Sequence, residues 1–159
     1  MSDPVAESPR FPRPALTVDL VIFAGEMPRE VLLIRRRQPP FANWWALPGG
    51  FVEENEPLAV AARRELKEET GIEVADFIQI GAFGDPGRDP RGWTVTVAYL
   101  AWVDRQQMTL LAGDDAADAQ WHSLADLPPL AFDHAMIIQQ ALVKFSEQHK
   151  NSNVGLPNP

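Results

Sequence analysis

The sequence predicts a mixed α/β fold, with helices packed on a central sheet that is largely antiparallel or mixed. Three observations support this prediction. Segments rich in β-branched and apolar residues recur between residues 16 and 124, two segments have helical periodicity, and turn-forming residues separate them. The chain has 159 residues and is 45% hydrophobic, which suits one domain with a buried core. We expect an irregular segment at 1–15, a folded domain at 16–148 and a flexible tail at 149–159.

The first half of the chain predicts strands around a loop. Residues 16–24, Leu-Thr-Val-Asp-Leu-Val-Ile-Phe-Ala, form an apolar and β-branched run that is typical of a strand. A turn at 25–30 leads to a return strand at 31–36. Pro39 and Pro40 indicate a loop at 38–43, and 44–47 is a short strand that ends at Pro48-Gly49-Gly50.

The second half contains the clearest helix, at residues 57–70. Pro57 suits its first turn, Ala59, Ala62 and Leu66 form an apolar stripe, and Gly71 is a natural helix stop. Further strands are predicted at 76–82, 93–103 and 119–124, separated by a loop at 84–92 and a polar connection at 106–117. A second amphipathic helix is predicted at 131–148, and residues 132–145 of it could pack a homodimer or close the core.

The composition narrows the possible functions. A formal net charge of −8 argues against nucleic acid as a partner, because nucleic acid binding requires a cationic surface. A polyanionic substrate would need bound cations or clustered arginines to reverse this field locally. The absence of cysteine excludes disulfides, zinc–thiolate sites and cysteine nucleophiles. No segment has the length of a membrane span or the apolar core of a signal peptide, so we expect a cytoplasmic protein without a membrane partner.

Three acidic residues of the first helix carry the chemical prediction. Glu65, Glu68 and Glu69 are spaced at i, i+3 and i+4, so they share one helical face. Their mutual repulsion costs stability unless a cation lies between them, and Mg²⁺ and Mn²⁺ prefer such oxygen ligands. A solvated surface face is the alternative. Gly49-Gly50 favours the metal site, because glycine lets the backbone approach a ligand closely.

These residues lie within a segment that resembles the signature of the Nudix hydrolase family. The signature is filled at every fixed position by Gly50, Glu56, Arg64, Glu65, Leu66, Glu68, Glu69, Gly71 and Ile72. The resemblance implies an α/β/α sandwich with a central mixed sheet, and assigns residues 16–148 to a Nudix hydrolase domain. It also implies cleavage of a phosphoanhydride bond in a nucleoside diphosphate linked to another group, with Mg²⁺ or Mn²⁺ as cofactor and an alkaline optimum.

The resemblance also implies roles for individual residues. Glu65, Glu68, Glu69 and the Gly50 carbonyl would hold the metal, while Glu56 and Arg64 would support them. An ordinary surface ion pair is the alternative for Arg64. The general base would be a signature glutamate or an acidic residue elsewhere. Asp114 and Asp115 are candidates for a base or an extra ligand, and a solvated turn is their alternative.

The loop at 84–92 bears on the substrate. Arg88 and Arg91 could bind phosphates or ribose hydroxyls, and the alternative is a loop held by internal Arg–Asp pairs. Pro86 lies 15 residues after Gly71, which resembles Nudix members that hydrolyse ADP-ribose. The resemblance therefore implies a small-molecule substrate, ADP-ribose, cleaved to AMP and ribose 5-phosphate. NADH, sugar nucleotides, dinucleoside polyphosphates and nucleoside triphosphates remain open, as does a non-catalytic ADP-ribose sensor.

Other side chains are predicted at the edge of this site. Arg35, Arg36 and Arg37 end a strand, and because strand residues alternate in direction, Arg36 is the predicted phosphate contact. One of Trp44 and Trp45 should be core, and Trp45 is the predicted substrate contact; Phe41 has the same ambiguity. His122 and His134 are predicted to be structural.

Overall fold

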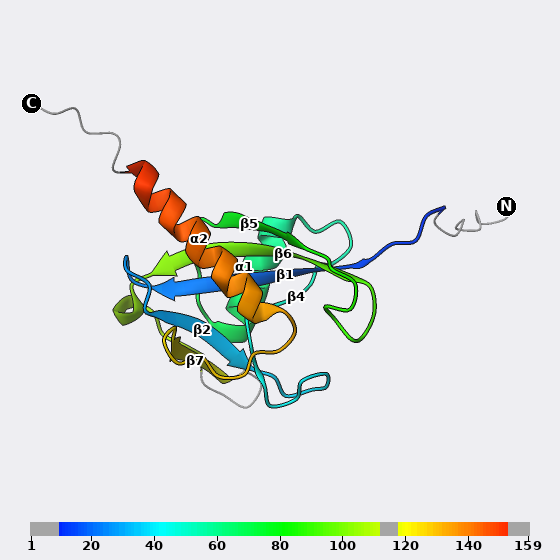
Figure 1. The fold of residues 1–159 in the computed structure, drawn as a ribbon, viewed down its shortest axis with the longest axis horizontal. Helices are drawn as coiled ribbons and strands as arrows, with labels where there is room; N and C mark the ends of the chain where they lie inside the picture. The colour runs from blue at the N-terminus through cyan, green and yellow to red at the C-terminus, as the bar shows by residue number, and fades with distance from the viewer. Residues whose placement is uncertain (1–9, 112–117, 153–159) are drawn as a thin grey trace, which may run out of the picture.

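The computed structural model describes residues 10–111 and 118–152 as one seven-stranded mixed sheet between two helices (Figure 1). The predicted α/β fold is therefore confirmed. The strands are β1 Ala15–Ala24, β2 Glu30–Arg35, β3 Trp45–Ala46, β4 Gly49–Phe51, β5 Ile78–Phe83, β6 Thr94–Val103 and β7 Asp118–Ser123; the helices are α1 Leu58–Thr70, the 3₁₀ turn η1 Arg105–Gln107 and α2 His134–Ser152. Among the described residues, no helix is both long and apolar enough to cross a bilayer.

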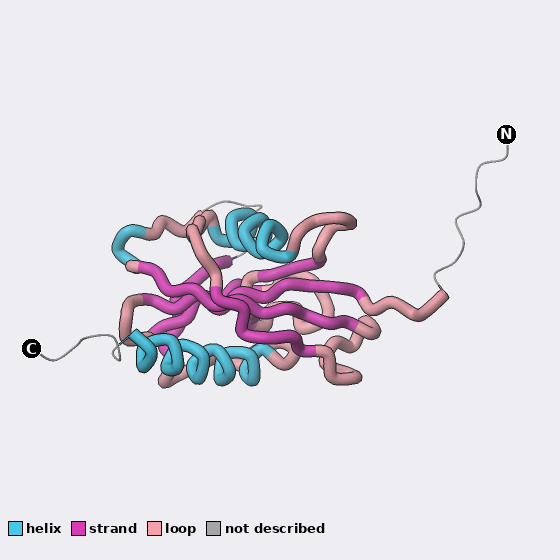
Figure 2. Tube along the Cα trace, turned by 90° about the horizontal axis from the view of Figure 1, so that it is seen from above, coloured by secondary structure: helices cyan, strands magenta, loops and turns pink. Residues whose placement is uncertain are grey.

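The sheet is the middle of three layers, with α1 on one face and α2 on the other (Figure 2). Alternation along β1 sends Leu20 and Ile22 toward α1, and sends Val21 and Phe23 toward α2. Each fully buried side chain of this size contributes about 1.5–3 kcal/mol. The two faces of β1 therefore bind both helices to the sheet.

The order of strands leaves a split in the sheet. β1 pairs with β6 in parallel over its whole length, from Ala15↔Thr94 to Ala24↔Val103. Its antiparallel pairing with β2 is registered only at Phe23↔Val31. Beyond that point β4 pairs with β1, whereas β3 pairs with β2. The two halves of the sheet diverge there, and the short turn from β3 to β4 crosses between them.

Strand β4 was not predicted, because Pro48-Gly49-Gly50 was interpreted as the stop of the strand at 44–47. Gly49 and Gly50 lie opposite Asp19 and Val18 of β1. A Cβ atom at Gly49 would collide with the carbonyl oxygen of Val18, so only glycine lets the backbone approach β1 so closely. The close packing on β1 makes this segment a strand although its composition indicates only a strand end.

Helix α2 is displaced from its predicted range of 131–148. It begins at His134, because Phe132 has a φ of 54° in the left-handed region and cannot continue a right-handed helix. It runs to Ser152, past the predicted end. The His149 ring stacks on Phe145 with ring centroids 3.9 Å apart, which ties the last turns to the core. Helix α1 begins at Leu58, one residue later than predicted, and is followed by the predicted Gly71 with φ 76°.

Arg64 fastens α1 to the strand and loop that precede it. Its guanidinium donates hydrogen bonds to both carboxylate oxygens of Glu56, at 2.7 and 2.9 Å, and to the Phe51 carbonyl oxygen at 3.1 Å. The same group bonds Glu65 at 2.8 Å. The Arg64 hydrogen bond, helped by the N–H of Glu53, lowers the pKa of Glu56 to about 2. Arg64 thus sets how α1 sits against β4.

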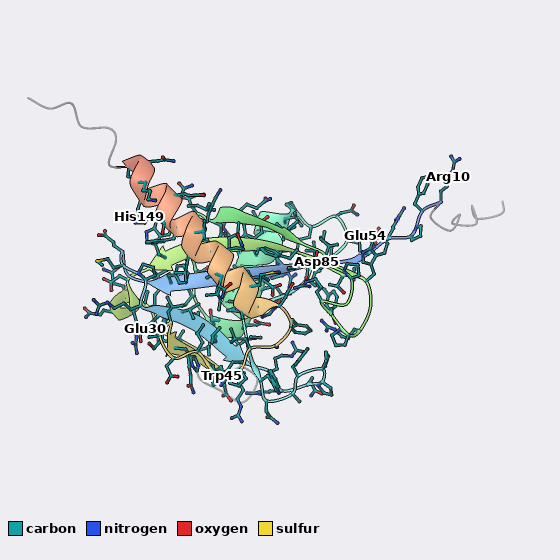
Figure 3. The ribbon with its side chains drawn as sticks, in the orientation of Figure 1. Arg10, Glu30, Trp45, Glu54, Asp85 and His149 are labelled. Carbon is teal, nitrogen blue, oxygen red and sulfur yellow. The ribbon has the colours of Figure 1, made fainter. Side chains whose placement is uncertain are left out.

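We expect this contact to make stability depend on acid pH. The pKa of Glu56 falls from an ordinary 4.5 to about 2 on folding, so its stabilising effect is complete above pH 4.5 and is lost as the pH falls to about 2. Urea unfolding of wild type and Glu56→Gln should differ most above pH 5 and converge near pH 2. Glu54→Gln, exposed on the same loop (Figure 3), should follow the wild type. A gap that stays constant with pH would contradict the assignment.

Candidate active site

Two adjoining cavities open at the split in the sheet, and they share Ile34, Arg36 and Glu69. The outer cavity, about 380 Å³, lies between the end of β2 and α1 and is also lined by Arg35, Arg37, Gln38, Glu65 and Glu68. The inner cavity, about 180 Å³, reaches from β1 to the start of α2 and is also lined by Thr17, Asp19, Ala46, Leu47, Gly49, Gly50, Phe51, Arg88, Asp89, Arg91, Phe132 and His134. Together they form one continuous cleft.

The three glutamates share the predicted face of α1 but differ in exposure. Glu68 keeps 60% of its side chain exposed, whereas Glu65 keeps 12%. Burial raises the pKa of Glu65, and it raises that of Glu69 to about 8. The Gly49 N–H donates to Glu69 Oε2 at 3.1 Å. Two carboxylates are therefore held where their charged forms are poorly solvated.

Gly50 lies directly against one of these carboxylates. A Cβ atom at this position would come within 2.5 Å of Glu65 Oε1. The absence of a side chain thus allows the β4 backbone and the Glu65 carboxylate to meet. This contact brings a main-chain segment and a helical carboxylate into the same corner of the cleft.

The donor set suits a hard divalent cation. Its atoms are carboxylate oxygens, which Mg²⁺ and Mn²⁺ prefer, and a cation would relieve the cost of burying Glu65 and Glu69. In the described part of the chain, no three acidic or histidine side chains already converge on one point. Arg64 engages Glu65 and Glu68, and the Gly49 N–H engages Glu69. The residues fit such an ion in kind.

Arg36 provides positive charge opposite the glutamates. It lines both cavities, and its guanidinium lies 4.9 Å from the Phe132 ring centroid. Its Nε donates to the Pro40 carbonyl oxygen at 2.8 Å, and among the described residues no carboxylate pairs with it. Burial lowers its pKa. A cation that is partly buried without an ion-pair partner is suited to an anionic ligand.

Arg88 and Arg91, the two predicted ligand contacts in the loop after β5, differ in how far they are exposed. Arg88 is mostly buried and makes a bidentate pair with Asp133, at 2.6 and 2.9 Å, so internal Arg–Asp pairing explains it better than a substrate contact. Arg91 also pairs internally, with Asp89 at 2.8 Å, but keeps 42% of its side chain exposed. Its guanidinium lies over Phe51 and Phe132 at the rim of the inner cavity. Arg91 therefore remains accessible to a ligand.

The predicted contact of Trp45 is not supported, because its ring lines neither cavity. It lies beside the end of β2 (Figure 3) and packs against His122 with ring centroids 4.3 Å apart. Trp44 is partly exposed and contacts Phe41, which in turn contacts Phe132. The Nε2 atom of His122 is buried and has no hydrogen-bond partner among the described residues. Asp114 and Asp115 lie outside the described residues.

The sequence reasoning missed Asp19 and Phe132, and treated His134 only as structural. All three line the inner cavity. A carboxylate within the apolar strand run of residues 16–24 was a signal that could have singled out Asp19, because buried charges are rare without a specific role. Phe132 had no such signal, since its role depends on a left-handed backbone.

Comparison with known proteins agrees with this geometry. The chain is 43% identical over 126 residues to an ADP-ribose pyrophosphatase of Methanocaldococcus jannaschii, covering 79% of this chain and 72% of that protein. It is 37% identical over 147 residues to the ADPR responsive transcriptional repressor NtrR of Acinetobacter baylyi, covering 87% of this chain but only 57% of the repressor. The NUDIX domain of Shewanella oneidensis NrtR, crystallised with ADP ribose, superposes with a TM-score of 0.76 at 37% identity, covering 90% of this chain and 93% of that one.

A family model for the NUDIX domain matches residues 13–141, which include the whole sheet and α1. Because that match spans most of the chain and contains both glycines and all three glutamates of the cleft, the chain belongs to the Nudix family.

Proposed function

We propose that this domain hydrolyses ADP-ribose to AMP and ribose 5-phosphate with Mg²⁺ or Mn²⁺. The observation that carries the proposal is the outer cavity, where the partly buried Glu65 and Glu69 share the lining with Arg36. The 43% identity to an ADP-ribose pyrophosphatase supports the choice of substrate. The solved NUDIX domain with ADP ribose supports the same ligand class.

Each part of the cleft has a role in this proposal. Glu65, Glu68, Glu69 and the Gly50 carbonyl would hold the ion, and Arg64 would orient Glu65. A bound divalent cation would offset charge on the phosphate oxygens and lower the pKa of the attacking water. Arg36 would bind a phosphate oxygen and stabilise the negative charge that grows during attack.

The reaction balances without a further reactant. The oxygen of water bonds to one phosphorus, and the bridging oxygen leaves with the other phosphate. The two products share the two protons of water before they equilibrate with solvent. The proton acceptor is one of the three glutamates or an acidic residue elsewhere on the chain, as the sequence predicted.

A non-catalytic ADP-ribose sensor is the second candidate. The ADPR responsive repressor at 37% identity favours it. The cluster of Glu65, Glu68 and Glu69 beside one cavity favours catalysis, because a protein that only binds the ligand has no need for three clustered carboxylates. Turnover separates the two candidates.

We expect purified protein with Mg²⁺ or Mn²⁺ to release AMP and ribose 5-phosphate in equal amounts from ADP-ribose, as resolved by ion-exchange chromatography. EDTA should abolish release. NADH, sugar nucleotides and nucleoside triphosphates run in parallel would show whether another nucleotide is preferred. Calorimetric binding of ADP-ribose without products would favour the sensor.

We expect Glu69→Gln to lower kcat at least about 100-fold, because an amide cannot supply the negative charge that holds the cation. The melting midpoint should not fall, since an amide avoids the cost of burying a charge and still accepts the Gly49 N–H. Glu73→Gln is the matched control, because Glu73 is exposed and pairs only with Lys67 among the described residues. Equal activity of both variants would count against the assignment.

We expect substitution of the two glycines of β4 to separate activity from folding. In Gly50→Ala the new Cβ meets the end of the flexible Glu65 side chain, so kcat should fall about 10- to 100-fold while the unfolding free energy changes by about 1 kcal/mol or less. In Gly49→Ala the Cβ meets the Val18 backbone, which should cost about 1–3 kcal/mol or more. Urea unfolding and steady-state kinetics measure both, and the reverse ranking would refute the packing argument.

A further inference from the structure

The inner cavity contains a polar pair that the proposed hydrolysis does not use, Asp19 and His134. Asp19 lies within β1 and is only 7% exposed. The Thr96 hydroxyl donates to its Oδ2 at 2.7 Å. Its Oδ1 lies 3.5 Å from Nε2 of His134, the first residue of α2. The pair therefore joins the middle layer of the fold to one of the outer layers.

The position of the proton on His134 follows from its other neighbour. The Leu47 N–H donates to Nδ1 at 2.9 Å, so Nδ1 must offer a lone pair. Burial lowers the pKa of His134, in keeping with a neutral ring. A neutral ring with an accepting Nδ1 carries its proton on Nε2. The Nε2–H donor therefore faces the Asp19 Oδ1 acceptor.

Neither atom is satisfied by the other. Their separation of 3.5 Å exceeds the usual range of about 2.7–3.2 Å for a hydrogen bond. Among the described residues, no hydrogen bond is formed by Asp19 Oδ1 or by His134 Nε2. Arg88 approaches the other Asp19 oxygen only to 3.9 Å, and its guanidinium is bound to Asp133. A donor and an acceptor thus stand side by side, on residues that both line the cavity.

The chemistry of this pair selects one kind of ligand group. A hydroxyl both donates and accepts, so it can bond Asp19 and His134 together. A phosphate would be repelled by the Asp19 carboxylate, and a methyl group would leave both atoms unsatisfied. Buried carboxylates hold ribose hydroxyls in other nucleotide sites by the same logic. The cavity of about 180 Å³ accommodates a fragment of a nucleotide beside the phosphate-binding outer cavity.

We propose that Asp19 and His134 form a subsite for a pentose, in which a sugar hydroxyl donates to Asp19 Oδ1 and accepts from His134 Nε2–H. This inference rests on the proposed function, since it places one ribose of ADP-ribose in the inner cavity. That ribose is either the terminal one or the one attached to adenine. Arg88 lies 3.9 Å from Asp19 Oδ2 and is held there by its bidentate pair with Asp133.

The test measures binding of ligands that cannot be hydrolysed, by calorimetry with Mg²⁺ present. We expect Asp19→Asn to weaken α,β-methylene ADP-ribose about 10- to 100-fold, as for loss of a hydrogen bond to a charged group. The Asn oxygen can keep Thr96 as its partner, which leaves an NH₂ donor where the Oδ1 acceptor stood. Asp85→Asn is the matched control, because it removes one exposed carboxylate outside both cavities and should not change affinity (Figure 3).

Two further ligands identify which ribose is bound. α,β-Methylene ADP lacks the terminal ribose, and a 2′,3′-dideoxyadenosine form of α,β-methylene ADP-ribose lacks the nucleoside hydroxyls. If the terminal ribose is bound, Asp19→Asn should weaken the dideoxy ligand and leave α,β-methylene ADP unchanged. If the nucleoside ribose is bound, the pattern should reverse. Either pattern supports the subsite.

The proposal is overturned if Asp19→Asn weakens all three ligands equally or weakens none. Should that variant not fold, His134→Asn serves instead, because its short amide can accept the Leu47 N–H but presents no donor at the Nε2 position. It should weaken the same ligands as Asp19→Asn and spare the same one, by about 3- to 10-fold. Failure of the wild type to bind or hydrolyse ADP-ribose would overturn the proposed function itself. If the wild type binds the ligand and Asp19→Asn binds it equally well, only the subsite is overturned.

Discussion

Two carboxylates of α1 are held against the backbone of β4, and the rest of the cleft depends on that contact. Burial raises the pKa of Glu65 and Glu69, so their charged forms are costly without a cation. Gly49 and Gly50 make the contact possible, because any side chain there would meet β1 or Glu65. Arg64, next to Glu65 in α1, holds the helix in the same position through Glu56 and the Phe51 carbonyl oxygen. The fold is therefore less stable without a cation, and this cost creates a binding site for positive charge beside Glu65 and Glu69.

The topology explains why this place opens at a cleft and not on a flat surface. β1 and β2 part after one registered pair, and β3 and β4 each stay with a different half of the sheet. Polar side chains can line the gap without breaking the continuous ladder of β1 and β6. The same gap connects the two faces of the sheet. Glutamates of α1 and residues at the start of α2 can therefore contact one ligand, although the helices cover opposite faces (Figure 2).

The sequence predicted the parts of this arrangement that depend on local patterns. The shared face of Glu65, Glu68 and Glu69 follows from helical periodicity, and the strands from β-branched runs. It did not predict that Trp45 would pack on His122, or that Asp133 would bind Arg88, because these pairs join residues far apart in the chain. Phe132 has a left-handed backbone conformation, so α2 begins only after it. A phenylalanine in the sequence does not indicate such a conformation.

Arg36 and the Asp19–His134 pair impose opposite requirements on a ligand, and in the proposed function this opposition would be the basis of selectivity. Arg36, without a described carboxylate partner, favours an anion where the cavities join. In the inner cavity, Asp19 disfavours an anion and requires a donor, while His134 requires an acceptor. Only a ligand with a charged phosphate beside an uncharged, hydroxylated group satisfies both. A free pyrophosphate would leave the inner pair unsatisfied, and a free sugar would leave Arg36 and the glutamates without a partner.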